Sequence, residues 1–358
     1  MLEMPADDVV DPHIHLFDLK GTPREMRPLG KLFGWNERIL RFMAAKLMPK
    51  EAITYFGKNT ALLGDYLAPD FRSDSESSRV TQYVHVQAGW KDKAPLDPVG
   101  ETEWLEAMAD KPAAIVAHAD LMLGAEVQHV LTAHHLASDR VRGVRHMLAA
   151  HPSSGVMDFA NDPEMSRSAA FRAGFDLLAR NDMSFDAWCY SHQIDQVGEL
   201  AAHNPDVPIV LCHVGTPVAM FGEFGGVGIS DQERARIADS WRDAISELAE
   251  QKHVHCKLSG LLMPVLGLGY EESKRKPGVD ELVNRLSSVV EHCVGAFGPE
   301  RCMVASNFPV DAVSAPYATV TEAMIEMTAR YGADAQQAMF ADTATAFYRI
   351  RGLAPKRD

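Results

Sequence analysis

Short apolar runs alternate with longer amphipathic segments along this chain, and this alternation constrains the fold more than any other feature. The pattern is typical of βα units, in which each strand is followed by a helix and the strands pair in parallel. We predict strands at residues 9–15, 81–88, 113–121, 141–148, 184–189, 208–213, 254–259 and 302–306. Eight such units favour a closed (β/α)8 TIM barrel, although the count alone leaves a doubly wound sheet open.

The placement of polar residues favours the barrel. His13, His15, His213, Ser259 and Asn307 stand at the carboxyl ends of predicted strands, on the face where barrel enzymes build their active sites. The length of 358 residues suits one barrel with insertions as well as two average domains. We expect a single domain over residues 1–358. Within it, residues 20–78 form an insertion that caps the carboxyl-terminal face and contains an amphipathic helix at 38–47.

Composition and charge exclude several classes of protein. The formal net charge of −14 argues against a nucleic-acid surface, which needs clustered lysine and arginine. No stretch approaches about 18 uninterrupted apolar residues, so we expect no membrane span. Five cysteines without CxxC spacing and an acidic start without a secretory signal favour the cytoplasm. We expect a small-molecule substrate, and the aromatic residues of the cap suit either a homodimer interface or a roof over the pocket.

His13 and His15 are separated by one residue near the end of the first predicted strand. Side chains alternate between the two faces of a strand, so these imidazoles point the same way and can share one cation or one substrate oxygen. His213 ends a later apolar run and brings a third imidazole to the same rim. The sequence therefore predicts a histidine cluster at the mouth of the barrel.

Two arginines flank Gly143 in the fourth predicted strand. The planar guanidinium of Arg142 or Arg145 matches a carboxylate in bidentate fashion, so an anionic substrate is one interpretation. An ion pair from these arginines to Asp186, which is flanked by apolar residues, is the other. Lys257 also has two interpretations, a nucleophilic amine or a structural ion pair.

In this order, the motifs resemble the amidohydrolase superfamily, and within it the amidohydrolase-2 group, which includes sugar lactonases and 2-pyrone-4,6-dicarboxylate lactonases. The motifs are His13-Ile-His15, Arg142-Gly-Val-Arg145, Phe185-Asp-Ala-Trp188 with His192-Gln193, His213-Val-Gly-Thr-Pro217, Lys257-Leu-Ser-Gly260 and Ser306-Asn-Phe-Pro309. The resemblance covers almost the whole chain. It implies an eight-stranded barrel with its site at the carboxyl-terminal mouth.

The resemblance also implies a metal and a catalytic acid. Many relatives hold a divalent metal through the paired histidines, further histidines and an acid on the eighth strand that takes a proton from water. Here Asn307 stands in place of that acid, and an amide cannot accept a catalytic proton. Asp311, four residues later, is the substitute that we consider. We expect at most one divalent cation, Zn²⁺ at His13, His15 and His213, or a metal-free site in which imidazoles and an arginine stabilise charge.

Hydrolysis of a small, anionic, cyclic ester or lactone by activated water is the leading hypothesis, with His13, His15, His213, Asn307 and Asp311 as the catalytic set. The substrate-binding set that we expect is Arg142, Arg145, Asp186, Tyr190, His192, Gln193 and Ser259. A metal-dependent non-oxidative decarboxylase is one alternative, because an arginine that anchors a carboxylate suits both reactions. A non-catalytic barrel that binds a metabolite is the other, with Asn307 as the mark of lost activity.

Overall fold

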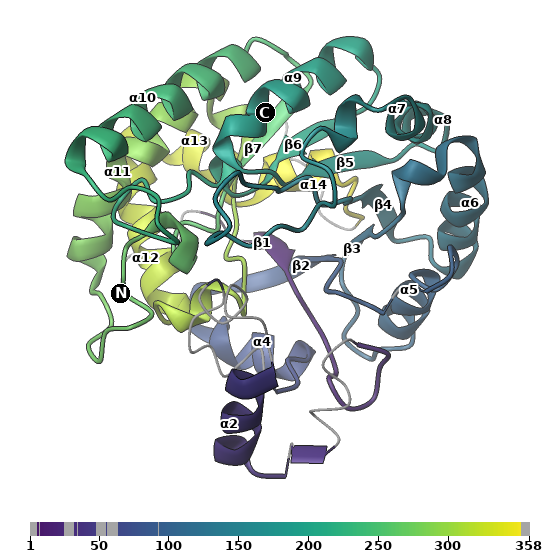
Figure 1. Cartoon of the computed structure of the whole chain (residues 1–358), viewed down its shortest axis with the longest axis horizontal. Coiled ribbons are helices and arrows are strands. Elements are labelled where there is room, and N and C mark those ends of the chain that lie inside the picture. Colours follow the sequence, from purple (N-terminus) through teal and green to yellow (C-terminus); the bar gives the residue numbers. More distant parts are fainter. Residues whose placement is uncertain are drawn as a thin grey trace.

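The computed structural model describes residue 6 and residues 8–24, 32–33, 35–47, 55, 64–91 and 93–351. Its centre is a sheet of eight strands that pair in sequence order (Figure 1). All neighbouring pairs in that order are parallel. The strands are β1 Val9–Ile14, β2 Val80–Val86, β3 Ala114–Ala117, β4 Val141–Val144, β5 Ser184–Ala187, β6 Ile209–Leu211, β7 Val254–Leu258 and β8 Cys302–Val304.

Every predicted strand overlaps an observed one, so the predicted barrel is confirmed. Most strands end earlier than the apolar runs do. The run at 141–148 forms a strand only over Val141–Val144, yet Leu148, Ala149 and Ala150 remain buried. These residues are apolar because they are buried in the loop at the barrel rim. The pattern of apolar residues along the sequence does not distinguish such a buried loop from a strand.

The barrel closes between β8 and β1 at the carboxyl-terminal rim. Ile14 forms a parallel bridge with Phe308. The N–H of His15 donates to the carbonyl of Phe308 at 2.8 Å. The N–H of Asn307 donates to the carbonyl of His13 at 3.0 Å. The last strand therefore meets the first through the residues that flank the predicted site.

The buried carboxylate of Asp11 supports this closure. Its Oδ1 accepts the N–H of His13 at 3.2 Å and the N–H of Ser306 at 3.1 Å. Its Oδ2 accepts the hydroxyl of Tyr317 at 2.9 Å. Burial raises the pKa of Asp11, and the bonds from Ser306 and Tyr317 act against that rise. One side chain thus ties the first strand to the turn after the last.

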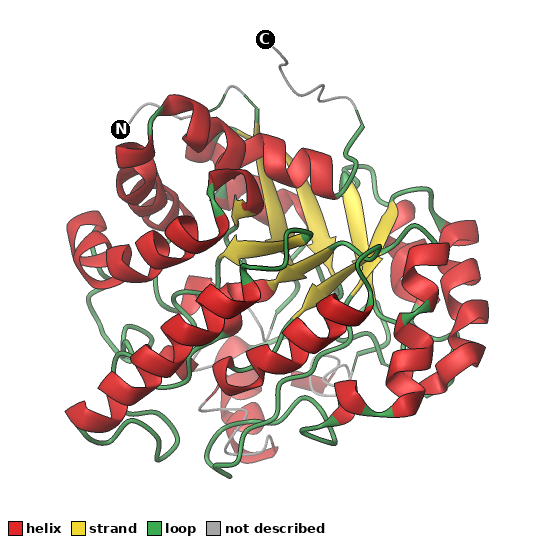
Figure 2. Cartoon of the chain, turned by 90° about the horizontal axis from the view of Figure 1, so that it is seen from above, coloured by secondary structure: helices red, strands yellow, loops and turns green. Residues whose placement is uncertain are grey.

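Helices cover the outer faces of the strands (Figure 2). α11 shows why, since its buried residues recur at spacings of three and four and form one apolar face. No described helix combines the length and the apolar character needed to cross a bilayer. The helices from β2 onward are α5 Val99–Glu106, α6 Val127–Ala137, α7 Ala169–Phe175, α8 Leu177–Arg180, α9 Ile194–His203, α10 Asp231–Leu248, α11 Val279–Phe297, α12 Tyr317–Thr328, α13 Ala333–Gln337 and α14 Thr343–Phe347.

The interior of the barrel is a packed core. Residues of and after α14, namely Ala344, Phe347 and Tyr348, pack against the interior side chains Val10, Val84, Val86, Val116, Val210 and Met303. The hydroxyl of Tyr348 donates to the carboxylate of Asp186 in β5, at 2.9 Å from Oδ2. The site at the mouth therefore rests on a filled interior and not on a channel.

Two helices precede β2, α2 Glu37–Leu47 and α4 Ala68–Asp74. α2 confirms the helix predicted at 38–47. Residues 25–31, 34, 48–54 and 56–63 of the predicted cap lie outside the described residues, so the cap stays a prediction. Leu32, Trp35, Phe42 and Leu47 are exposed near or within α2, and the homodimer also stays a prediction.

Gly143 in β4 lies against Ser184 in β5. A Cβ on residue 143 would lie 2.3 Å from the hydroxyl oxygen and 2.9 Å from the carbonyl oxygen of Ser184. We expect Gly143→Ala to lower the free energy of unfolding by about 1–3 kcal/mol, the usual cost of overpacking. Gly295→Ala in α11 is the control, because a Cβ there meets nothing within 4 Å and should stabilise by about 0.5–1 kcal/mol. Equal urea midpoints for the two variants would contradict the close approach of the strands.

Candidate active site

Three imidazoles meet at the carboxyl-terminal rim, as the sequence predicts. The Nε2 atoms of His13 and His15 lie 3.2 Å apart, and the ring centroids of His13 and His213 lie 4.4 Å apart. His213 follows β6 with a left-handed φ of 55°, and its Nδ1 lies 2.9 Å from the hydroxyl oxygen of Ser259. His13 therefore contacts both other rings, and Ser259 orients the third.

The three imidazoles are neutral near neutral pH. Burial lowers the pKa of His13 well below its usual value, and the nearby charge of Lys257 lowers it further. Burial and then the charge of Arg145 do the same to the pKa values of His15 and His213. Neutral rings can accept or donate a hydrogen bond, so the cluster is suited to binding a polar group and not to holding positive charge of its own.

Arg145 follows β4 and reaches the same cluster. It is 5% exposed. Nη2 of Arg145 donates to the carbonyl of Gln87 at 2.7 Å, and Nη1 lies 3.4 Å from Nε2 of His13. Within the described residues no carboxylate bonds to this guanidinium, and its buried Nε has no hydrogen-bond partner. Because a buried charge is costly unless it is paired, this guanidinium is suited to take an anionic group as a further partner.

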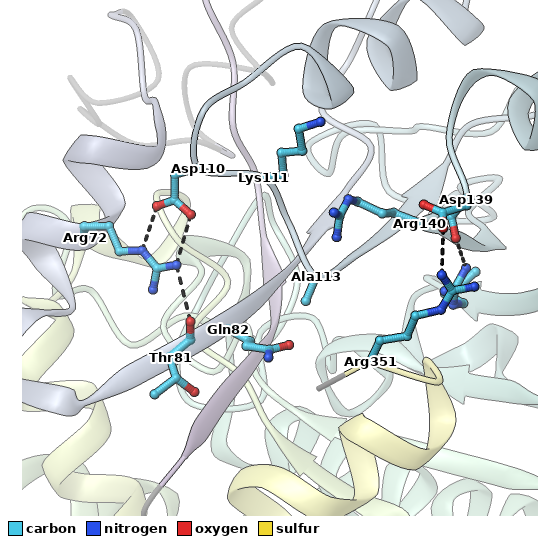
Figure 3. A pocket seen from close by; sticks show the side chains of 10 residues that line it. Arg72, Thr81, Gln82, Asp110, Lys111, Ala113, Asp139, Arg140 and Arg351 are labelled. Carbon is cyan, nitrogen blue, oxygen red and sulfur yellow. Dashed lines mark hydrogen bonds and ion pairs between the residues drawn. The ribbon is translucent and has the colours of Figure 1, made fainter. Parts of the chain in front are cut away.

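Arg142 does not join the histidines. It lies near the start of the four-residue strand β4, whereas Arg145 follows its end. Arg142 donates to the carbonyls of Asp139 and Val141. It lines a separate cavity of about 460 Å³ at the amino-terminal ends of the strands. Figure 3 shows other side chains that line this cavity, among them Arg72, Asp110, Lys111, Arg140 and Arg351. The short strand separates the two arginines, and we no longer assign Arg142 to the substrate.

Asp186 and Lys257 form a fully buried ion pair next to the cluster, with 2.6 Å between Nζ and Oδ2. The expectation that Asp186 pairs with Arg142 or Arg145 is therefore wrong, and the ion-pair interpretation of Lys257 is confirmed. The physical reason is the layering of a barrel interior, in which alternate strands contribute side chains to one layer. Asp186 comes from β5 and Lys257 from β7.

Asn307 and Asp311 face each other in the turn after β8. Nδ2 of Asn307 donates to Oδ1 of Asp311 at 2.9 Å, and the N–H of Leu262 donates to Oδ2 at 3.2 Å. Asn307 has a left-handed φ of 59°, and the chain turns back so that Asp311 approaches it. Burial raises the pKa of Asp311 to about 7 despite these two bonds. This carboxyl group can therefore exchange a proton near neutral pH.

Gln193 has no hydrogen-bonding group left for a substrate. Its Oε1 accepts the N–H groups of Ala150 at 3.1 Å and Tyr190 at 3.3 Å. Its Nε2 donates to the carbonyls of Leu148 at 2.9 Å and Pro163 at 3.2 Å. A side-chain amide has two donor hydrogens and two acceptor lone pairs. We therefore assign Gln193 to holding the loops together.

His192 and Tyr190 also depart from the predicted binding set. His192 lines another cavity with His151 and Asp195, between α9 and α10. Tyr190 is buried in an apolar cluster beside the site, and its hydroxyl donates to the carbonyl of Met157 at 2.6 Å. Of the seven predicted binding residues, Arg145 and Ser259 thus contact the histidines directly, and Asp186 does so through Lys257.

Sequence reasoning missed Trp188 and Tyr55. The ring centroid of Trp188 lies 6.4 Å from that of His213, and the Cζ of Arg145 lies 5.9 Å from the Trp188 ring. Tyr55 packs edge-on against Trp188 at 6.5 Å. The signal for Trp188 was its place two residues after Asp186, which puts both on one face of an extended chain. Tyr55 is one of the aromatic residues of the predicted cap, for which a roof over the pocket was one of two interpretations.

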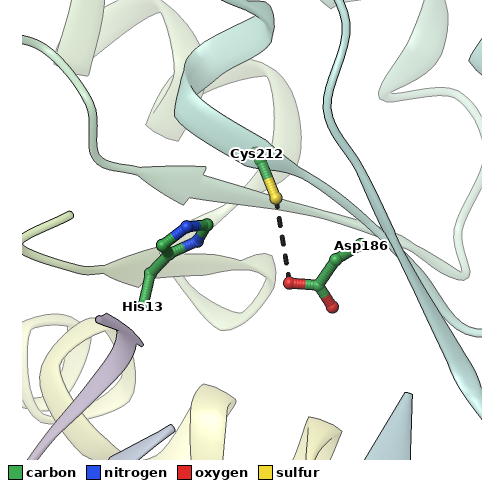
Figure 4. A group of neighbouring side chains, drawn as sticks. All are labelled: His13, Asp186 and Cys212. Atoms are coloured by element: carbon green, nitrogen blue, oxygen red, sulfur yellow. Dashed lines mark hydrogen bonds between the residues drawn. The ribbon is translucent and has the colours of Figure 1, made fainter. Parts of the chain in front are cut away.

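The donor atoms at the rim do not form the predicted metal site. Among the described residues, the set of His, Cys, Asp or Glu side chains whose donor atoms all lie within 4.8 Å of one another is His13, Asp186 and Cys212 (Figure 4). His15 and His213 are not part of it. The 3.2 Å spacing of His13 and His15 would suit two ligands of one ion, but the third imidazole does not complete the set.

Charge also opposes a divalent ion here. Nζ of Lys257 already contacts both Asp186 and His13, so an ammonium group takes the place of a cation in that set. Arg145 brings a second permanent positive charge to the histidines. Asn307 supplies no negative charge to balance either of them. The residues present therefore do not fit a zinc site.

Known proteins resemble this chain, one of them over almost its whole length. A family model described as Amidohydrolase matches residues 10–350. The uncharacterised protein y4mH of Sinorhizobium fredii is 32% identical over 345 residues, which is 96% of this chain and 98% of that protein. L-fucono-1,5-lactonase of Burkholderia multivorans is 29% identical over 220 residues, which is 61% of this chain and 66% of that enzyme.

Solved structures share the barrel. An amidohydrolase of Burkholderia multivorans with bound zinc has a TM-score of 0.69 at 21% identity, covering 96% of this chain and 99% of that one. The 5-carboxyvanillate decarboxylase LigW of Sphingomonas paucimobilis has a TM-score of 0.52 at 12% identity, covering 96% and 100%. At these identities the likeness shows the fold and leaves the reaction open.

Arg145 and Arg142 provide a matched test of anion binding, since Arg145 follows the end of β4 at the histidine cluster and Arg142 lies near the start of the same strand. We expect malonate at about ten times its dissociation constant to stabilise the protein by about 1.4 kcal/mol. Arg145→Gln should lose this stabilisation because its buried guanidinium is removed, and Arg142→Gln should keep it. Thermal melts of each protein with and without malonate measure the effect. An equal malonate shift in Arg145→Gln and the unmodified protein would reject Arg145 as the anion site.

Proposed function

Because the chain belongs to the amidohydrolase family, whose model matches residues 10–350, we propose that it hydrolyses a small, anionic, cyclic ester or lactone with water as the nucleophile. Family membership and the similarity to an L-fucono-1,5-lactonase support a hydrolytic enzyme. One observation carries the finer proposal. It is the buried guanidinium of Arg145, which has no anionic partner among the described residues and stands beside neutral imidazoles.

Arg145 selects the substrate in this proposal. Its Nε has no hydrogen-bond partner among the described residues, and a planar guanidinium binds a carboxylate through two parallel hydrogen bonds. Burial strengthens that attraction, because the effective dielectric constant is lower than in water. The ring of Trp188 lies beside the guanidinium and offers a flat apolar surface to a ring-shaped substrate.

The histidine cluster stabilises the transition state. Attack of water on an ester carbonyl places negative charge on the carbonyl oxygen, which fixed hydrogen-bond donors in a dry site stabilise. Nη1 of Arg145 and Nε2 of His13 lie 3.4 Å apart, close enough for one oxygen to contact both. His213, whose ring centroid lies 4.4 Å from that of His13 and whose Nδ1 contacts Ser259, offers a further imidazole to this oxygen.

Asp311 is the proposed base. Its pKa of about 7 gives a carboxylate that takes a proton from the attacking water. The same proton then neutralises the alkoxide that leaves when the ring opens, so no net proton is required from solution. Asn307 holds this carboxylate through its amide and is a positioning residue in this scheme.

No step of this scheme uses zinc. The expected Zn²⁺ at His13, His15 and His213 remains the alternative that a zinc-bound relative suggests. The two neighbouring cations and the missing acid argue against it.

A decarboxylase is the second candidate function, and two observations favour it, although the residues present do not fit the zinc that a metal-dependent enzyme would need. The fold neighbours include a decarboxylase, and protonated Asp311 could deliver a proton to the carbon that loses carbon dioxide. The non-catalytic alternative is not retained, because the family and its lactonase-named relative support an enzyme.

Isotope labelling separates the two reactions. In water enriched in ¹⁸O, hydrolysis of a panel of carboxylated lactones should place one label in the new carboxylate without release of carbon dioxide. His213→Ala, which removes one face of the cluster, should abolish uptake of the label. Release of carbon dioxide without labelling of the product would overturn the lactonase proposal in favour of the decarboxylase.

The dependence of activity on pH follows from Asp311. Its folded-state pKa is raised to about 7 by burial, so the carboxylate that acts as base predominates above that pH and is lost below it. We expect kcat/KM to rise with pH through about 7 and then level off. Asp311→Asn should remove this limb and lower kcat by about 10²–10⁴-fold. The exposed control Asp334→Asn should keep the profile, and activity that falls as pH rises through 7 would instead fit Asp311 as an acid.

A further inference from the structure

Lys257 is a buried charged group that the scheme above gives no chemical step. Its side chain is 0% exposed. Nζ lies 2.6 Å from Oδ2 of Asp186, 2.8 Å from the carbonyl oxygen of Pro12 and 3.2 Å from Nδ1 of His13. These three contacts match the three hydrogens of an ammonium group. The lysine therefore touches a proposed catalytic histidine with its last available donor.

The contact with His13 defines where that ring carries its proton. An ammonium group has no lone pair, so it can only donate. Nδ1 of His13 must then present a bare lone pair to Lys257. Nδ1 of His15 donates to the carbonyl of Val86 at 2.8 Å, so Nε2 of His15 presents a lone pair to Nε2 of His13 at 3.2 Å, and the proton of that contact is on Nε2 of His13. Nη1 of Arg145, the more distant neighbour at 3.4 Å, is also only a donor and cannot hydrogen-bond to this N–H.

The other end of the ion pair is held as firmly. The hydroxyl of Tyr348 lies 3.0 Å from Oδ1 and 2.9 Å from Oδ2 of Asp186. The thiol of Cys212 lies 3.7 Å from Oδ2. With its carboxylate partner fixed from two sides, Lys257 cannot turn away from His13 without losing a buried ion pair.

We propose that Lys257 is a positioning residue that holds His13 as an Nε2–H donor and thereby keeps zinc out of the histidine cluster. A metal-bound histidine offers the lone pair of one nitrogen and donates the N–H of the other to an acceptor. His15 has that arrangement, since its Nδ1 lies 2.8 Å from the carbonyl oxygen of Val86. His13 has the reverse. Zinc at Nε2 would move the ring proton to Nδ1, where it would point at an ammonium group.

The same proton has a use in the reaction. An Nε2–H beside Nη1 of Arg145 gives the carbonyl oxygen of a substrate two donors, as stabilisation of an oxyanion requires. This catalytic part of the inference rests on the proposed function. The exclusion of zinc does not, because it follows from contacts inside the protein.

The position of the proton can be measured in the unmodified protein. ¹⁵N NMR of histidine-labelled protein distinguishes a bare ring nitrogen from a protonated one, and His13→Gln identifies the signals of His13 by their loss. We expect a bare Nδ1 and a protonated Nε2. A protonated Nδ1 overturns the proposal, and this measurement does not depend on whether a variant of the ion pair folds.

Zinc affinity tests the consequence. Lys257→Met/Asp186→Asn removes both charges together and leaves an acceptor for the Tyr348 hydroxyl. In chelator-treated protein titrated with zinc alone, we expect the double variant to bind about 10–100-fold more tightly than the unmodified protein, the size of effect typical of a ligating histidine's partner. Lys252→Met removes an exposed lysine and should change nothing.

Zinc binding by the unmodified protein that equals or exceeds that of the double variant overturns the inference. Both measurements are made without substrate. A failure to find lactone hydrolysis would therefore reject the proposed function alone, whereas a zinc-binding unmodified protein would reject the role of Lys257 alone.

Discussion

The contact between the ends of β8 and β1 is the constraint on which the rest of the structure depends. It closes the sheet, and the residues that close it are those that flank or form the site, His13, His15 and Asn307. The carboxylate of Asp11 is buried beneath this seam, where an unpaired charge would be costly. Bonds from two backbone N–H groups and the Tyr317 hydroxyl offset that cost. Closure of the barrel therefore places His13 and His15 beside the turn that carries Asn307.

Positive charge fixed in the protein organises the cluster. Lys257 contacts Nδ1 of His13, and Arg145 lies beside Nε2 of the same ring. Among the described residues a carboxylate, that of Asp186, forms an ion pair with Lys257, and none does so with Arg145. A buried ion pair is a weak source of stability, because desolvation offsets most of the attraction. Its value here is geometric, since it orients a neutral ring. Arg145, to which no carboxylate of the described residues bonds, is the group through which we propose that the site selects an anion.

Much of the fold could be predicted from the sequence, and less of the site. The alternation of apolar runs gave the number and order of the strands, and the spacing of His13 and His15 correctly put both rings on one side. The strand ends were not readable, because buried loop residues such as Leu148 prolong the apolar pattern. That uncertainty is why Arg142 and Arg145 looked equivalent, although the strand between them ends at Val144.

The partner of Asp186 could not be found from local pattern. Lys257 and His13 meet it because β1, β5 and β7 are alternate strands that contribute to one interior layer. Knowledge of the barrel would have placed these three together, whereas spacing along the chain could not. Gln193 was predicted to bind substrate for a related reason. All four hydrogen-bonding positions of its amide are used by the loops around it, and this is visible only in the folded structure.

The hydroxyl of Tyr348 reaches Asp186 from a position 162 residues further along the chain. During synthesis on the ribosome, every strand emerges before this hydroxyl does, so the nascent barrel holds a carboxylate that awaits one of its bonds. The segment around α14 can therefore pack into the barrel interior only after all eight strands have been made. A chain that ends after β8 because of a premature stop codon would keep all eight strands and every histidine of the cluster. It would lack Ala344, Phe347 and Tyr348, which fill the barrel interior beneath that cluster.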